Sequence, residues 1–232
     1  MRIGGLQKLT LVDYPGKVAA TVFLIGCNFK CGFCQNPELV DPEKIEEQPL
    51  IKEEKFFRFL DSKQGLIEGI CITGGEPTIQ SDLIDFIKKI KSKGFLIKLD
   101  TNGSKPEILS KLVNENLLDF VAMDIKTSWS KYDKVTRVKV DLKKIKKSVE
   151  LIKNSGLDYE FRTTIVPGMV DEKDIEQIGQ WLKGAKNFAL QQFQNKKVLD
   201  KKFEKIKPYP DETLKEFQKI LEKYIGKIEL RV

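Results

Sequence analysis

The sequence predicts an α/β protein built around a parallel β-sheet. Short apolar runs alternate with amphipathic stretches of helical spacing along the chain. Most of the runs are bounded by Gly, Pro, Asn or Asp, as strands covered on both faces of a parallel sheet usually are. Such alternation indicates β-α units, which occur both in open doubly wound sheets and in barrels. The predicted strands are Val18–Leu24, Gly69–Thr73, Leu96–Asp100, Phe120–Asp124, Tyr159–Val166 and Phe188–Phe193, and Lys227–Val232 is a candidate for a last one.

Helices are expected between these strands, and some of their ends can be located. Gly94 follows an apolar helical repeat and is expected as its C-cap. Ser104 and Glu107 have the spacing of a capping box, and Asp141 stands where it can cap a further helix. The apolar residues that carry the helical repeats lie within 56–60, 83–90, 108–113, 142–152, 175–181 and 214–224.

Length and composition indicate a soluble globular protein of one domain or at most two. The chain is 41% hydrophobic and 32% charged, and it is long enough to bury a substantial core. No stretch reaches the length of a membrane span, and the first residues lack the apolar core of a signal peptide. Four cysteines, three of them close together, do not form the pattern of a secreted disulfide framework. We therefore expect a cytoplasmic protein without a membrane partner, with its core over residues 16–195 and a helix and a strand in 196–232.

The formal net charge of +7 raises the question of nucleic-acid binding. Lysines such as Lys143, Lys144, Lys146 and Lys147 fall between apolar helix positions, which indicates a solvated helix face. No nucleic-acid motif with interleaved aromatic residues accompanies them. The sequence therefore argues against nucleic acid as a partner.

Three cysteines, Cys27, Cys31 and Cys34, lie within eight residues directly after the first apolar run. A short loop brings its sulfur atoms together at little extra cost in entropy, and thiolates select zinc, copper(I) or iron–sulfur clusters. A structural zinc site takes four protein ligands. The chain has no histidine, and its other cysteine, Cys71, lies in an apolar run where a small core residue is expected. Three cysteines can instead hold a 4Fe–4S cluster and leave one iron open for chemistry.

Polar or glycine-rich segments follow the second and third predicted strands, where functional groups of parallel α/β folds gather. The second strand continues into Gly74-Gly75-Glu76. The two glycines let backbone approach a ligand closely, and the carboxylate can pair with an ammonium group, although the segment alone is also compatible with an ordinary turn. The third strand ends in Asp100-Thr101-Asn102-Gly103.

The fourth, fifth and sixth strands carry further polar residues. Asp124 and Lys126 follow the fourth strand, and on their own they would be explained by a surface ion pair of little worth. Arg162 lies within an otherwise apolar strand, so a protein carboxylate or a ligand must meet its guanidinium. Gln194 follows the sixth strand and can donate and accept hydrogen bonds without titrating.

The cysteine spacing, with Phe33 before the last cysteine, resembles the cluster loop of the radical S-adenosylmethionine (SAM) enzymes. The resemblance implies a single radical SAM domain folded as a partial (β/α)6 barrel, with an extra C-terminal strand as an option. It also implies two cofactors, a 4Fe–4S cluster held by three cysteines and SAM, whose amino and carboxylate groups bind the open iron. An electron from the cluster then cleaves SAM into methionine and a 5′-deoxyadenosyl radical.

The later motifs are similar to those of the glycyl-radical-enzyme activases within this family. The resemblance implies an adenine contact from the backbone of residues 33–35, a SAM amino-group contact from the Gly-Gly-Glu turn, and a methionine contact from Lys126. A monovalent cation is implied near Asp100, Thr101 and Asp124. Related pyruvate formate-lyase activases carry a histidine near Gln194, where this chain has none. The implied SAM contacts are Phe33, Gln35, Gly74, Gly75, Glu76, Asp100, Thr101, Asn102, Asp124, Lys126, Arg162 and Gln194.

With the runs Leu11–Gly16 and Cys34–Glu38 included, the chain is most similar to activating proteins of anaerobic ribonucleoside-triphosphate reductase. Such enzymes remove a hydrogen atom from a backbone glycine of that partner and receive electrons from a donor such as flavodoxin or ferredoxin. Two alternatives remain open. The chain could be a radical SAM enzyme with another target, such as pyruvate formate-lyase or a small molecule. It could also be a non-catalytic iron–sulfur or metal-binding module, which would normally recruit a fourth cysteine.

Overall fold

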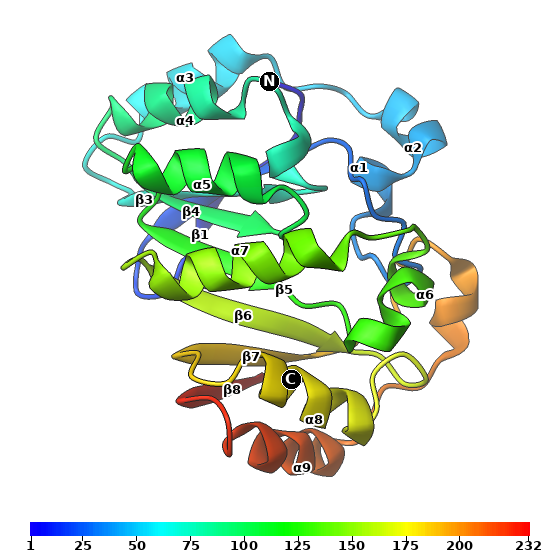
Figure 1. Cartoon of the computed structure of the whole chain (residues 1–232). Coiled ribbons are helices and arrows are strands. Elements are labelled where there is room, and N and C mark those ends of the chain that lie inside the picture. The colour runs from blue at the N-terminus through cyan, green and yellow to red at the C-terminus, as the bar shows by residue number, and fades with distance from the viewer. The chain divides into compact units, whose positions relative to one another are not determined.

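Strands and helices alternate along the chain, as the sequence predicts (Figure 1). The computed structural model describes residues 1–232. The strands are β1 (Ile3–Thr10), β2 (Ala19–Leu24), β3 (Gly69–Gly74), β4 (Leu96–Thr101), β5 (Phe120–Asp124), β6 (Asp158–Ile165), β7 (Asn187–Gln192) and β8 (Lys227–Arg231). They follow one another in the sheet in chain order. β1 runs antiparallel to β2, whereas β2 to β4 and β6 to β8 are parallel.

All six predicted strands are confirmed, each to within one residue at either end. The candidate strand over Lys227–Val232 is confirmed by β8. The α/β class with a mostly parallel sheet is confirmed as well. The sequence did not predict β1, because only Ile3 and Thr10 of its eight residues are buried and no apolar alternation marks it.

The helices lie where the apolar repeats predict them, but two predicted caps are wrong. Helix α4 (Leu83–Lys91) has Ser92 as its C-cap, so Gly94, with a φ of +85°, lies two residues beyond the cap. Helix α5 begins at Pro106 with Lys105 as its N-cap, so Ser104 and Glu107 form no capping box. Pro106 is pre-organised for the first helical position, and the Ser104 amide instead donates to the Asn102 side chain (2.9 Å). The helices are α1 (Pro37–Val40), α2 (Pro42–Glu47), α3 (Glu53–Asp61), α4 (Leu83–Lys91), α5 (Pro106–Asn114), α6 (Tyr132–Thr136), α7 (Leu142–Asn154), α8 (Glu172–Trp181) and α9 (Asp211–Leu221), with 3₁₀ turns η1 (Pro77–Ile79), η2 (Trp129–Lys131) and η3 (Lys201–Lys205).

The contacts within the chain divide it into two compact units, each assembled from separate segments. Unit 1 comprises Met1–Asn28, Glu38–Thr101 and Lys105–Val121. Unit 2 comprises Phe29–Pro37, Asn102–Ser104 and Ala122–Val232. The boundary falls inside the cysteine loop and inside β5 rather than in a linker. A single domain with its core over residues 16–195 stays a prediction.

Unit 1 is built on β1 to β4, with β2, β3 and β4 in parallel register. Ala19, Gly69 and Leu96 align across these three strands. Figure 1 shows α3, α4 and α5 covering one side of them. The centres of the Phe56 ring of α3 and the Phe86 ring of α4 lie 5.2 Å apart, so aromatic packing joins these two helices.

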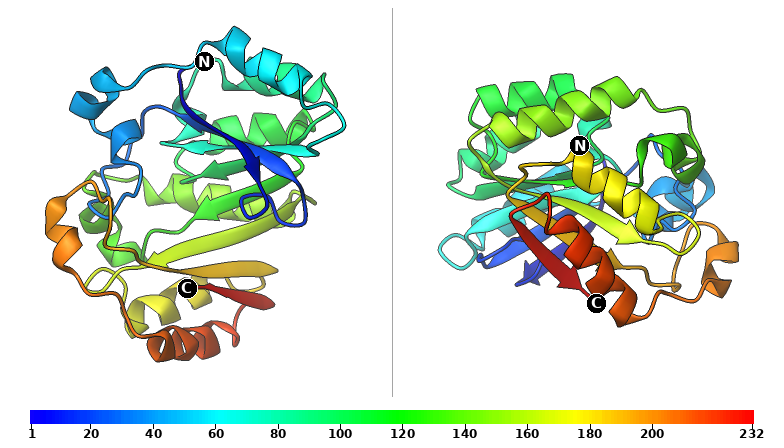
Figure 2. Two further views of the ribbon diagram at one scale, coloured as in Figure 1. Left: turned by 180° about the vertical axis from the view of Figure 1, so that it is seen from behind. Right: turned by 60° about the horizontal axis from the view of Figure 1, so that its bottom comes forward.

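Unit 2 is built on the end of β5 and on β6 to β8. The Ile125 amide donates to the Arg162 carbonyl (2.8 Å), which ties the residue after β5 to β6. Arg162, Ala189 and Glu229 align across β6, β7 and β8. Figure 2 shows α9 lying along β8, next to α8. Asp141 caps α7 through the Lys143 amide, as predicted. No helix in the chain has both the length and the apolar character that crossing a membrane requires.

Candidate functional site

The turn after β3 is bonded to the end of β2, directly before the first cysteine. The Gly75 amide donates to the Leu24 carbonyl and the Glu76 amide to the Gly26 carbonyl, both at 2.8 Å. Gly74 has a φ of +117°, and a Cβ on Gly75 would lie 1.9 Å from the Gly26 oxygen. Both glycines are therefore required by the chain's own backbone. They fix the Glu76 turn beside the residue that precedes Cys27.

Glu76 is a buried carboxylate with several protein donors. It is 1% exposed, and its Oε1 accepts from the Thr101 hydroxyl (2.7 Å) and the Thr78 amide (3.1 Å). The Thr78 hydroxyl donates to the same oxygen. The structure thus brings Glu76 and Thr101, two predicted site residues, together at the ends of β3 and β4. A carboxylate oriented in this way is a suitable partner for a ligand ammonium group.

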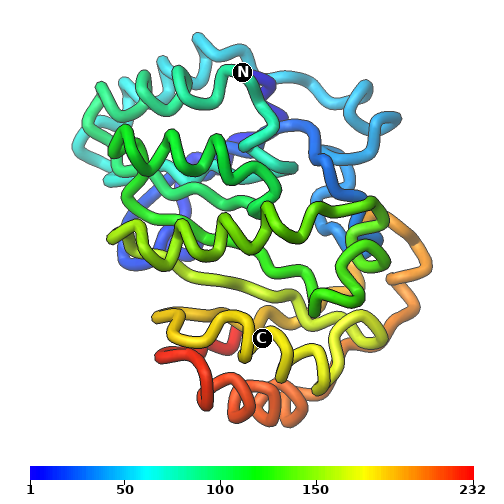
Figure 3. The backbone as a smooth tube through the Cα atoms, in the orientation of Figure 1, coloured from blue at the N-terminus to red at the C-terminus, as the bar shows by residue number.

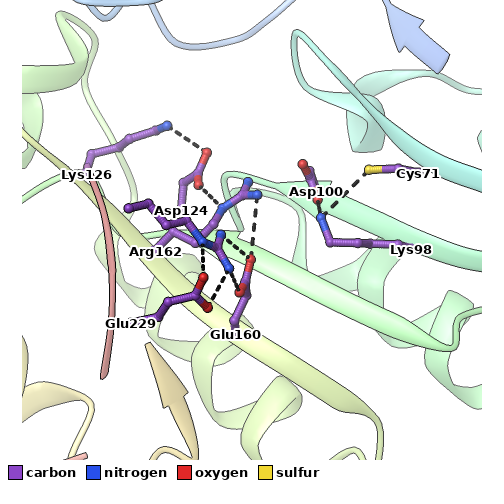
Figure 4. Close-up of polar contacts among 9 residues, drawn as sticks. Cys71, Lys98, Asp100, Asp124, Lys126, Glu160, Arg162 and Glu229 are labelled. Atoms are coloured by element: carbon purple, nitrogen blue, oxygen red, sulfur yellow. Dashed lines mark hydrogen bonds and ion pairs between the residues drawn. The ribbon is translucent and has the colours of Figure 1, made fainter. Parts of the chain in front are cut away.

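Asp100, the next predicted site residue, meets a lysine that the sequence analysis missed. Lys98 is 2% exposed and its ammonium donates to the Asp100 carboxylate. The same nitrogen lies 3.8 Å from the Cys71 sulfur (Figure 4). It also lies 5.8 Å from the centre of the Phe120 ring. Cys71 is fully buried, which confirms it as a core residue. The signal that singled out Arg162, a cation in an apolar strand, is also present at Lys98.

In unit 2 the cysteine loop is anchored by backbone hydrogen bonds from distant segments. The Lys30 amide donates to the Thr136 carbonyl (2.9 Å). The Gly32 carbonyl accepts from the Asp200 amide (2.9 Å), and the Cys34 carbonyl accepts from the Leu199 amide (3.0 Å). Figure 3 shows the chain around residue 200, in orange, passing beside α6. This segment after residue 195 supports the loop, which the sequence did not indicate.

Side chains pack closely around the same loop. Phe33 is buried against Phe203 (ring centres 6.3 Å apart). A Cβ on Gly32 would lie 2.4 Å from the Phe203 ring and 2.7 Å from the Arg137 guanidinium, which pairs with Asp200 at 2.5 Å. Any side chain at position 32 would therefore displace these neighbours.

Two further predicted residues meet within unit 2. The Gln35 side-chain amide donates to the Gln194 carbonyl (3.2 Å), so residues from the loop and from the end of β7 lie together. The Asn102 side chain accepts from the Ser104 amide and shapes the turn after β4. The four cysteines form no disulfide. Burial raises the pKa of the Cys31 thiol to about 11, against the opposing effect of the nearby Lys126 ammonium.

Asp124, Lys126 and Arg162 form one charge cluster. The Asp124 Oδ1 accepts from Arg162 Nε (2.9 Å), and its Oδ2 accepts from Lys126 Nζ (3.0 Å), as Figure 4 shows. Burial alone would raise the pKa of Asp124, but the guanidinium and the ammonium outweigh it and hold that pKa well below its ordinary value. The pKa of Lys126 is raised, because Asp124 and Cys31 outweigh the effect of burial. A protein carboxylate therefore meets Arg162.

The cluster continues across β6 to β8 with alternating charge. Arg162 Nη1 lies 3.9 Å from Glu160, which is buried on the same strand. Arg231 of β8 holds Glu160 with two hydrogen bonds (3.0 and 2.7 Å) and also pairs with Glu229 at 3.1 Å. Ala189 of β7 is the register partner of Arg162 on β6 and of Glu229 on β8, so a small side chain lies between these two charged residues. Sequence spacing could not reveal Arg231, because it comes from the last strand.

Comparisons with known proteins agree with these motifs. Residues 21–182 match the model of the radical SAM superfamily. The chain is 37% identical over 235 residues to a protein of Methanocaldococcus jannaschii whose name describes it provisionally as a glycyl-radical enzyme activating enzyme, covering 99% of this chain and 95% of that one. It is 30% identical to the pyruvate formate-lyase-activating enzyme of Clostridium pasteurianum, covering 80% and 78%. The crystal structure of Streptococcus suis SuiB bound to S-adenosylmethionine has the same fold over 89% of this chain and 48% of that one (TM-score 0.66, 16% identity).

The charge cluster predicts a pH-dependent stability. Because the folded pKa of Asp124 is lowered, its stabilising effect is complete above the unfolded pKa of about 4 and is lost as the pH falls toward the folded value. We expect Asp124→Asn to lower the free energy of unfolding by about 1.5–3 kcal/mol at neutral pH. The deficit should stay constant down to about pH 5 and shrink below about pH 4, as measured by urea unfolding of the reduced protein.

Asp61→Asn is the matched control, because Asp61 pairs with Lys93 but is more than half exposed. That change should cost under about 1 kcal/mol. A deficit for Asp124→Asn that stays the same at the lowest pH reached, or that never exceeds the control, would contradict the assigned pairing.

Proposed function

This chain belongs to the radical SAM superfamily and is an activating enzyme for a glycyl radical enzyme, and we propose that its protein substrate is the anaerobic ribonucleoside-triphosphate reductase. Its cofactors are a 4Fe–4S cluster and SAM. When bound, they supply a 5′-deoxyadenosyl radical, which removes a hydrogen atom from carbon. The protein provides binding, orientation and electrostatics for that chemistry.

The donor set fits the cluster. Cys27, Cys31 and Cys34 supply three thiolates of the kind that such clusters take, one fewer than would close all four irons. The backbone of residues 30–34 is anchored at Lys30, Gly32 and Cys34 without use of any sulfur. The loop can therefore keep its path while the thiols exchange their protons for iron. Cys71 contacts Lys98, and we assign it to the core and not to the cluster.

The charged residues of the site suit the parts of SAM. We assign Glu76 to the amino group, because its carboxylate is oriented by Thr78 and Thr101 at a strand end. Lys126 and Arg162 suit the carboxylate and the rest of the methionine part, since both are cations already positioned by Asp124. Phe33, Gln35 and Gln194 are assigned to the adenosyl part. Gly74 and Gly75 contribute to the SAM site by permitting the turn that carries Glu76. Asp100, Thr101 and Asn102 are assigned to the part of the site at the end of β4.

The choice of the reductase is supported by two runs outside the charged motifs. With Leu11–Gly16 and Cys34–Glu38 included, the chain resembles the reductase activases most. The second candidate is activation of pyruvate formate-lyase, which the similarity to the Clostridium pasteurianum enzyme favours. The absence of histidine in this chain counts against it, since related pyruvate formate-lyase activases carry one near the end of the sixth strand, where this chain has Gln194. For the electron donor we propose an acidic flavodoxin or ferredoxin in the cytoplasm, because the net charge of +7 favours encounter with acidic proteins.

The cluster assignment predicts a clear difference among the four cysteines. After anaerobic reconstitution, Cys27→Ala, Cys31→Ala and Cys34→Ala should each lose most of the iron and sulfide, because three ligands cannot be reduced to two without exposing a second iron. Cys71→Ala is the matched control and should retain about four iron atoms per chain, as the wild type does. Iron and sulfide analysis with visible absorbance makes the measurement. Loss of the cluster in Cys71→Ala to the same extent as in Cys31→Ala would show the assignment to be wrong.

The substrate assignment predicts a glycyl radical on one partner. Reduced, reconstituted enzyme and SAM are incubated separately with the anaerobic reductase and with pyruvate formate-lyase from the same organism. Electron paramagnetic resonance should show the glycyl doublet on the reductase and not on the lyase, with the Cys31→Ala protein as a blank for both. A doublet on the lyase alone would select the second candidate. Rapid SAM cleavage with a small metabolite and no doublet on either protein would reject the activase role.

A further inference from the structure

Lys98 is the most deeply buried cation described at the strand ends of unit 1. Its neighbours on β4, Ile97 and Leu99, are fully buried apolar residues, and Lys98 itself is 2% exposed. A buried ammonium is costly unless it is paired and hydrogen-bonded. The contacts of the Lys98 ammonium must therefore compensate the cost of burying it.

Three contacts fix the position of that ammonium. It donates to Asp100 Oδ1, two residues further along β4 on the same side of the strand. It lies 3.8 Å from the Cys71 sulfur on the neighbouring strand β3, and 5.8 Å from the Phe120 ring centre, within the range of a cation–π contact. Figure 4 shows Lys98 reaching between Cys71 and Asp100. The Cys71 sulfur and the Phe120 ring contact the Lys98 ammonium without neutralising its charge.

The Asp100 carboxylate thus has a full positive charge supplied by the protein. The activase motifs imply instead a monovalent metal cation near Asp100 and Thr101. A unit charge from Lys98 gives Asp100 the same compensation, and a second cation at this carboxylate would be repelled by the first. The residues present do not fit a site in which Asp100 needs an added metal cation.

We propose that Lys98 is a positioning residue that serves as the resident counter-cation of Asp100, so that SAM binding by this enzyme does not depend on a monovalent metal ion at that carboxylate. The proposal rests on the proposed function in one respect only, namely that Asp100 belongs to the SAM site. The pairing of Lys98 with Asp100 is independent of it.

The first test uses the wild-type holoenzyme. The SAM dissociation constant is measured by equilibrium dialysis in KCl, NaCl and choline chloride at one ionic strength. We expect the three values to agree within about twofold. A constant that is lower by about tenfold or more in KCl or NaCl than in choline chloride would overturn the proposal.

The second test uses Lys98→Met, which keeps the apolar stem and removes the charge. SAM binding by this variant should weaken by about tenfold in choline chloride. It should recover in KCl or methylammonium chloride, whose cations can enter the space that the ammonium leaves. A purely structural lysine would show no such rescue. Lys91→Met is the matched control, because Lys91 pairs with Asp119 (2.8 Å) in the same unit, and it should show no salt-specific effect.

The third test needs neither cluster nor SAM. Melting temperatures of the cluster-free proteins are compared in the same salts, since a bound cation stabilises the folded state. Lys98→Met should melt higher in KCl or methylammonium chloride than in choline chloride, whereas wild type and Lys91→Met should show no difference among the salts. If Lys98→Met behaves as the wild type does in both the melting and the binding series, the proposal fails. Failure of all proteins to bind SAM, with the melting series as expected, would instead count against the proposed function.

Discussion

The charge cluster of unit 2 depends on the Asp124 carboxylate, which accepts hydrogen bonds from both Arg162 and Lys126. Lys126 and Arg162 are largely withdrawn from water, and pairing with Asp124 offsets the desolvation cost of both cations. The same constraint continues outward, where Glu160 lies near Arg162 and is itself held by Arg231. Each charge is placed by its opposite, so the cations assigned to SAM are oriented before any ligand arrives. Such pre-organisation reduces the ordering that binding would otherwise require.

The uncharged parts of the site are placed by close backbone approach. In unit 1 the Gly74-Gly75 turn lies so near Leu24 and Gly26 that no side chain fits, and this fixes Glu76 beside the start of the cysteine loop. In unit 2 the loop carbonyls at Gly32 and Cys34 are bonded to Asp200 and Leu199. The path of the cysteine loop is therefore held by hydrogen bonds of its peptide groups.

The sequence predicted those features that depend on local pattern. Apolar runs predicted the buried strands. The cysteine, Gly-Gly-Glu and Asp-x-Lys motifs were recognised at the ends of these strands. β1 was missed because it contains two glycines and a run of three exposed residues, so that its apolar residues do not alternate. The capping box at Ser104 was wrong because Pro106 sets the first turn of α5. Arg231 and the loop contacts of Leu199 and Asp200 are separated from their partners by many residues, and no single-sequence pattern connects them. Lys98 could have been found by the argument applied to Arg162.

We propose that Asp124 and Arg162, which are joined by a 2.9 Å hydrogen bond, act as one pre-organised unit in SAM binding. A double-mutant cycle tests it, with SAM affinity measured for the reconstituted wild type, Asp124→Asn, Arg162→Gln and the double variant. We expect each single change to weaken SAM binding, and the double variant to lose much less affinity than the sum of the two losses, with a coupling energy above about 1 kcal/mol. Losses that add within about 0.5 kcal/mol, or single variants that bind SAM as the wild type does, would contradict it.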